Sequence, residues 1–144
     1  LKTDKLHSNY NNHLYIDETL LSGSFHRIQP AKNSFISKLA GENPSPLVYS
    51  NHHQCVDDLG LNYSVMARSM DGKIVEALKH DKYENVIGVQ FHPEAMRLYN
   101  TDIQFRIAPG DPLQTGKEVL RKQNSYQFHV NYWKDFSQRF NELK

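Results

Sequence analysis

The segment VIGVQFHPE, residues 86–94, decides the fold predicted for this chain. Its first six residues are short, largely apolar and rich in β-branched side chains, which is typical of a strand buried on both faces of a sheet. His92, Pro93 and Glu94 follow at once. In open α/β sheets the active site lies beyond the carboxyl ends of the strands. The position of His92 therefore makes it a catalytic candidate.

The proline between His92 and Glu94 favours a specific geometry. It disfavours helical backbone at His92 and pushes that residue toward an extended conformation. In extended chain, residues two apart point to the same side, so the Glu94 carboxylate can reach the His92 ring. A carboxylate on one ring nitrogen selects the tautomer and leaves the other nitrogen to act as a base. We predict that the pair is the back half of a nucleophile–histidine–acid relay; the alternative is a turn histidine with Glu94 capping the next helix.

The segments before this motif alternate between strand and helix patterns. Residues 24–29 alternate in polarity and end at Pro30, and a short helix capped by Asn33-Ser34 is expected to follow. Further strands are predicted at 47–50, 61–67 and 74–78, and a shorter one at 13–17. Asp71-Gly72 between the second and third of these is a strong signal for a hairpin. The pattern predicts a layered α/β fold with a mixed sheet and a buried central strand at 86–91.

The end of the chain predicts a helix with one apolar face. Trp133, Phe136, Phe140 and Leu143 recur at spacings of three and four, which places them on one side of a helix. We expect that side to pack on the sheet.

Composition excludes several classes of function. The 144 residues carry 17 basic and 16 acidic side chains, a balance that argues against a dedicated nucleic-acid binder. No apolar run approaches the roughly 20 residues that span a bilayer, and we expect no membrane partner and a cytoplasmic location. Cys55 is the single cysteine, so no intramolecular disulfide can form.

Three motifs in order resemble a known family. VIGVQFHPE at 86–94 is similar to the final catalytic motif of class I glutamine amidotransferases, and VYSNHHQ at 48–54 is similar to the Ser-x-His loop that precedes it. VMARSMDGKIVEA at 65–77 and FHRI at 25–28 resemble the γ-glutamyl-γ-aminobutyrate hydrolase group within that superfamily. The resemblance covers about residues 24–95 and implies the C-terminal half of a three-layer, flavodoxin-like α/β sandwich, present here as one domain over 1–144.

The resemblance also implies an activity and its catalytic residues. It implies hydrolysis of a γ-glutamyl amide by a Cys-His-Glu triad, with His92 and Glu94 in the last two roles and a thioester intermediate. The family's Gly-x-Cys-x-Gly elbow does not occur in this chain, and Cys55 lacks the flanking glycines, which favours a packing role for it. We therefore expect the nucleophile to lie in an N-terminal half of the same protein. The start at Leu1 is interpreted in the same way, as a fragment or a split chain.

The loop at 50–54 is the candidate substrate-binding region. The resemblance implies that Ser50, His52, His53 and Gln54 help to hold the ends of a γ-glutamyl substrate, largely through backbone groups. The alternative, left open, is a solvated loop at the exit of a strand. Adjacent histidines cannot easily direct both rings at one metal ion, and we expect no metal site and no cofactor. Glu76 is interpreted mainly as a partner in a hairpin salt bridge.

Several rival functions share these features. A folate-type γ-glutamyl hydrolase would use the same His92 and Glu94 with a different pocket. A glutaminase subunit would pass ammonia to a synthetase partner. A regulatory protein that had lost the nucleophile would bind without catalysis. The small-molecule substrate, the N-terminal half and a possible second copy of the chain are the expected partners.

Overall fold

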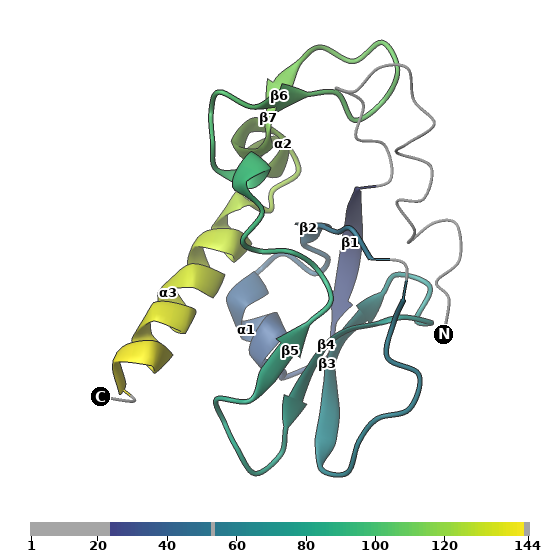
Figure 1. Cartoon of the computed structure of the whole chain (residues 1–144), viewed down its shortest axis with the longest axis vertical. Coiled ribbons are helices and arrows are strands. Elements are labelled where there is room, and N and C mark those ends of the chain that lie inside the picture. The colour runs from purple at the N-terminus through teal and green to yellow at the C-terminus, as the bar shows by residue number, and fades with distance from the viewer. Residues whose placement is uncertain (1–23, 53, 143–144) are drawn as a thin grey trace.

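The computed structural model describes residues 24–52 and 54–142 (Figure 1). The strand predicted at 13–17 lies outside these residues. In chain order the elements are β1 Phe25–Pro30, α1 Phe35–Ala40, β2 Leu47–Tyr49, β3 Tyr63–Ser69, β4 Val75–His80, β5 Ile87–Val89, the 3-10 helix η2 Met96–Leu98, β6 Gln104–Phe105, β7 Gln114–Thr115, α2 Gly116–Lys122 and α3 Tyr126–Glu142. The α/β class predicted from the sequence is confirmed.

The main sheet is antiparallel and strongly curled. Its order is β2-β1-β3-β4-β5, and every described pair of neighbours is antiparallel rather than mixed. The first half of β1 pairs with β2 and the second half pairs with β3, so β1 forms a corner between two ladders. Register shifts near Ala67 in β3 add a further bend. As a result the ends of β2 and β5 meet, and His92 N–H donates to Tyr49 O at 2.8 Å.

The hairpin and the short helix form as the sequence predicts. Gly72 has a φ of +76° in the turn between β3 and β4, a conformation that glycine adopts without steric cost. The Asp71 side chain accepts the Lys73 N–H at 3.1 Å and so closes this turn. Helix α1 begins at the Ser34 cap, whose hydroxyl accepts Ser37 N–H at 3.0 Å.

Strand β5 lies at an edge of the described sheet, which corrects the prediction of a buried central strand. Its residues are half-buried, and Val86 just before it is 43% exposed. The segment is apolar because residues such as Ile87 and Val89 pack against the core from one side of the strand. Periodicity in so short a run does not distinguish one covered face from two.

Helix α3 is confirmed, but the predicted apolar side is not buried along its whole length. Phe136 and Phe140 are 53% and 59% exposed. The helix instead packs through Phe128, His129 and Tyr132. These packed residues lie in the first half of α3. His129 and Phe136 are seven residues apart and so differ by only about 20° around the helix, which means that burial changes along the helix rather than from one side to the other.

The main core lies between the sheet and the two helices α1 and α3, which contact each other. Its fully buried members are Ile28, Ile36, Leu39, Val48, Met66, Ala67, Ala77, Phe91 and Phe128. Figure 1 shows α1 and α3 running along the same side of the sheet. Among residues 24–52 and 54–142, no helix has the length and hydropathy needed to span a membrane.

A second core supports the chain beyond Glu94. It consists of Leu47, Tyr49, Leu98, Phe105, Val119 and Leu120. Helix α2 begins with a capping box in which Thr115 and Glu118 satisfy each other's backbone N–H groups. The signal for this helix in the sequence is Thr115 followed three residues later by Glu118. Gly116 brings the start of α2 so close to η2 that an added Cβ would lie 2.1 Å from Arg97 O.

We expect Gly116→Ala to destabilise the chain by about 1–3 kcal/mol, because the methyl group must displace the backbone of η2. Urea unfolding of the purified chain, followed by tryptophan fluorescence, measures this difference. Gly60→Ala is the matched control, since its Cβ would meet only the Tyr63 ring, at 3.3 Å. Equal stabilities for the Gly116→Ala variant and the unchanged chain would contradict the close approach.

Candidate active site

His92 and Glu94 face each other just beyond β5. His92 Nδ1 lies 2.8 Å from Glu94 Oε1, and the two side chains are 42% and 61% exposed. An ionised carboxylate only accepts hydrogen bonds, so the ring carries its hydrogen on Nδ1 in this contact. The Nε2 atom of the neutral ring then has a lone pair and can accept a proton. The geometry predicted from the order strand, histidine, proline and glutamate is present.

Backbone and aromatic contacts fix this turn on both sides. The His92 N–H is held by Tyr49 O across the curled sheet. The Tyr99 hydroxyl donates to Pro93 O at 2.5 Å, and Trp133 Nε1 donates to the Tyr99 oxygen at 2.8 Å. Helix α3 therefore braces the turn through Trp133, which explains a half-exposed tryptophan that packs little with the core.

The charge of Glu94 is favoured by its surroundings. Partial burial acts to raise the pKa of the Glu94 carboxyl, but the hydrogen bond with His92, together with a backbone hydrogen bond at Glu94 and the charge of His92, lowers the pKa below its ordinary value of 4.5. At neutral pH the carboxylate is thus ionised and stabilises a protonated His92 ring.

The predicted substrate loop divides into buried and exposed parts. Ser50 and His52 are buried, and Ser50 N–H donates to Ser24 O at 2.7 Å. Gln54 is exposed, although its backbone oxygen accepts Gln90 Nε2 at 2.8 Å. His53 lies outside the described residues. The Ser50 amide is thus engaged within the fold, and of the described candidate residues Ser50, His52 and Gln54, only Gln54 is exposed.

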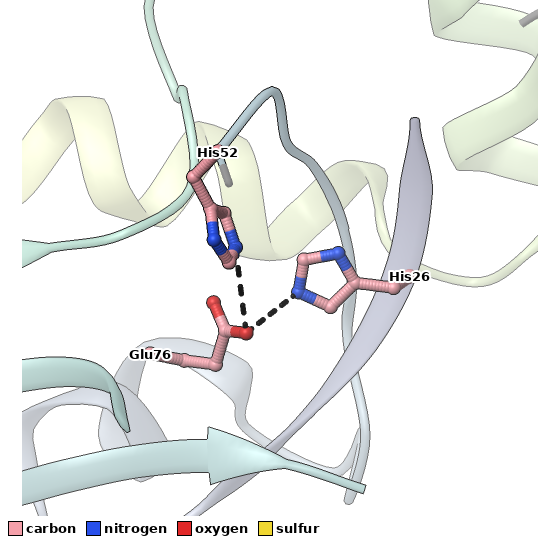
Figure 2. Close-up of side chains that lie close together, drawn as sticks. All are labelled: His26, His52 and Glu76. Carbon is pink, nitrogen blue, oxygen red and sulfur yellow. Dashed lines mark ion pairs between the residues drawn. The ribbon is translucent and has the colours of Figure 1, made fainter. Parts of the chain in front are cut away.

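Glu76 corrects the prediction of a hairpin salt bridge. It is fully buried on β4, and its Oε1 lies 3.0 Å from His26 Nε2 and 3.8 Å from His52 Nε2 (Figure 2). His129 of α3 is also buried, with 1% exposure, and its Nε2 forms a hydrogen bond with Leu47 O at 3.0 Å. Burial lowers the pKa of His129 against the raising effect of that bond.

Comparisons with known proteins identify the family of this chain. The model of the peptidase C26 family matches residues 3–94, which ends at Glu94 and covers more than half of the chain. The chain belongs to the peptidase C26 family. A relative described as a putative glutamine amidotransferase-like protein of Rickettsia prowazekii is 39% identical over 79 residues, which cover 55% of this chain and 28% of that protein.

A solved structure with partial similarity is described as a putative GMP synthase component from Thermoplasma acidophilum. It has a TM-score of 0.41 and 18% identity, and the match covers 79% of this chain and 47% of that one. Both matches span less than half of the relative's own length. This member of the peptidase C26 family thus corresponds to part of the length of each of these two proteins.

In this peptidase C26 chain, His92→Ala should raise the pKa of Glu94, because the hydrogen bond that lowers it is removed. The pKa of Glu94 is lower in the folded chain than in the unfolded chain. The contact therefore contributes its full stability at pH values above about 4.5 and loses it as the pH falls through the pKa of the folded state. A carboxyl-carbon NMR titration of the variant and the unchanged chain measures the shift.

Glu118 is the internal control for this titration. Its pKa is lowered mainly by hydrogen bonds from Thr115 and should not respond to a change at His92. An unchanged pKa of Glu94 in the variant would show that the 2.8 Å contact does not persist in solution.

Proposed function

We propose that this chain supplies the histidine and the acid of a cysteine-dependent hydrolase that cleaves γ-glutamyl amide bonds. The contact between His92 Nδ1 and Glu94 Oε1 at 2.8 Å carries the proposal. The family is one of cysteine-type hydrolases and amidotransferases. The exposed fraction of the His92 side chain, 42%, leaves its ring accessible to a nucleophile from outside the described residues.

The chemistry follows from the two ring nitrogens. Nε2 of His92 takes the proton of a cysteine thiol, and the sulfur attacks the γ-carbonyl carbon. The carbon–nitrogen bond then breaks, the amine leaves with the proton from His92, and a γ-glutamyl thioester remains. Water, deprotonated by His92, cleaves the thioester to give glutamate and the free thiol. Glu94 holds the ring and stabilises its charge in each step.

The nucleophile is proposed to lie in an N-terminal half of the same protein. Cys55 has a free, half-buried thiol in the loop after β2. It follows directly on Gln54 and is not on a strand-to-helix elbow, because the described chain from 54 to 62 contains no helix. The proposed partners are a γ-glutamyl amide substrate, the N-terminal half of the protein and a possible second copy of the chain. We propose no nucleic-acid or membrane partner, and we propose a cytoplasmic location.

Activity assays on the intact native protein test this function. His92→Asn should lower kcat for release of glutamate from a γ-glutamyl amide by about a thousandfold or more, as for other relay members, and Glu94→Gln by a smaller factor. Cys55→Ser should leave kcat almost unchanged. A thousandfold loss in Cys55→Ser would instead identify Cys55 as the nucleophile.

The same assay separates the rival functions. Activity limited to poly-γ-glutamyl folates would indicate the folate-type hydrolase, and ammonia release that requires an added synthetase would indicate a glutaminase subunit. If the intact protein binds γ-glutamyl amides but hydrolyses none of them, it is a non-catalytic regulatory protein. That result would contradict the proposal.

A further inference from the structure

The interior of the curled sheet contains a second cluster of chemically active side chains. His26 comes from β1, His52 from the loop after β2, and Glu76 from β4, and Figure 2 shows all three directed at one point. Their ligand-capable atoms lie within 4.8 Å of one another. His26 is 12% exposed at the side chain, His52 7% and Glu76 0%.

The buried carboxylate requires a positive partner. Transfer of an ionised carboxylate from water to a protein interior costs several kcal/mol unless it is paired. Neither oxygen of Glu76 accepts a hydrogen bond of good geometry from the described residues. His26 Nε2 lies 3.0 Å from Glu76 Oε1, which is an ion pair when the ring is protonated and places two potential metal ligands side by side when the ring is neutral.

The orientation of His52 identifies which atom it presents to Glu76. Its Nδ1 lies 3.2 Å from the backbone oxygen of Gln54, which can only accept, so Nδ1 carries the hydrogen. The lone pair of the neutral ring is then on Nε2, which faces Glu76 Oε1 at 3.8 Å. A lone pair and a carboxylate oxygen repel each other at this distance, and a cation between them removes the repulsion. A carbonyl on the far nitrogen is also how proteins orient metal-binding histidines.

The spacing fits a tetrahedral ion. Two ligands that are each about 2.1 Å from Zn²⁺ lie about 3.4 Å apart at a tetrahedral angle. The observed separations of 3.0 Å and 3.8 Å fall on either side of this value. Two histidines and a carboxylate are a known zinc-binding set that leaves a fourth position for another ligand.

The geometry points to a Zn²⁺ site formed by His26, His52 and Glu76, separate from the proposed catalytic pair. The ion joins β1, β4 and the loop after β2 in one place. Because Gln54 O contacts both the His52 ring and Gln90 Nε2, binding of the ion also fixes Gln54 beside Gln90, which lies two residues before His92. No metal site was predicted, because adjacent histidines cannot easily share one ion and because ligands about 25 residues apart match no short zinc motif.

Cobalt binding to the full chain tests the site without an activity assay. Titration of the purified, metal-stripped chain with Co²⁺ should give the visible absorption of a four-coordinate ion, saturating at about one equivalent, and Zn²⁺ should abolish it. Glu76→Gln and His52→Asn should each lose this absorption. His80→Gln, on the last residue of β4, is the control and should retain it.

Some variants of buried residues fail to fold, so NMR of the unchanged chain is the second measurement. Zn²⁺ should shift the ring signals of His26 and His52 and leave those of His80 and His92 unchanged. Three results would each overturn the site: no cobalt absorption by the unchanged chain, cobalt absorption retained by a folded Glu76→Gln variant, or Zn²⁺-induced ring shifts confined to His92. If cobalt absorption is absent while the three side chains remain in contact, a proton rather than a metal ion neutralises the charge of the Glu76 carboxylate.

Discussion

The hydrogen bond from His92 N–H to Tyr49 O closes the curled sheet, and the rest of the site depends on it. Tyr49 ends β2 and His92 follows β5, and these are the two outermost strands of the described sheet. A flat sheet of this order would hold their ends far apart, since neighbouring strands are separated by about 4.8 Å. The corner in β1 and the irregular register in β3 supply the curvature that brings them together.

The closure places two groups of polar residues near the loop that follows β2. His92 and Glu94 lie on the exposed side, where a nucleophile and a substrate can approach. His26, His52 and Glu76 lie on the buried side, within the curl (Figure 2). Buried polar networks hold a backbone in one arrangement only when all their members are satisfied. The loop is therefore the element through which the interior of the sheet can affect the geometry of the catalytic pair.

The sequence predicted local features better than long-range ones. The Ser34 cap, the Asp71-Gly72 turn and the relation of His92 to Glu94 depend on residues close together in the chain, and each was predicted. The edge position of β5, the part of α3 that is buried and the surroundings of Glu76 depend on which segments meet after folding. The contact between His26 and Glu76 joins two strands that are far apart in the chain, so no spacing of residues in the sequence indicates it.

The central claim is that His92 activates a thiol other than Cys55, and affinity labelling tests it most directly. The intact native protein is treated with a chloromethyl ketone analogue of glutamine, and the alkylated residue is located by peptide mass mapping. We expect the label on a cysteine outside this chain, at a rate that falls sharply in His92→Asn because the thiolate is then no longer formed at neutral pH. A label on Cys55, or a labelling rate independent of His92, would contradict the account.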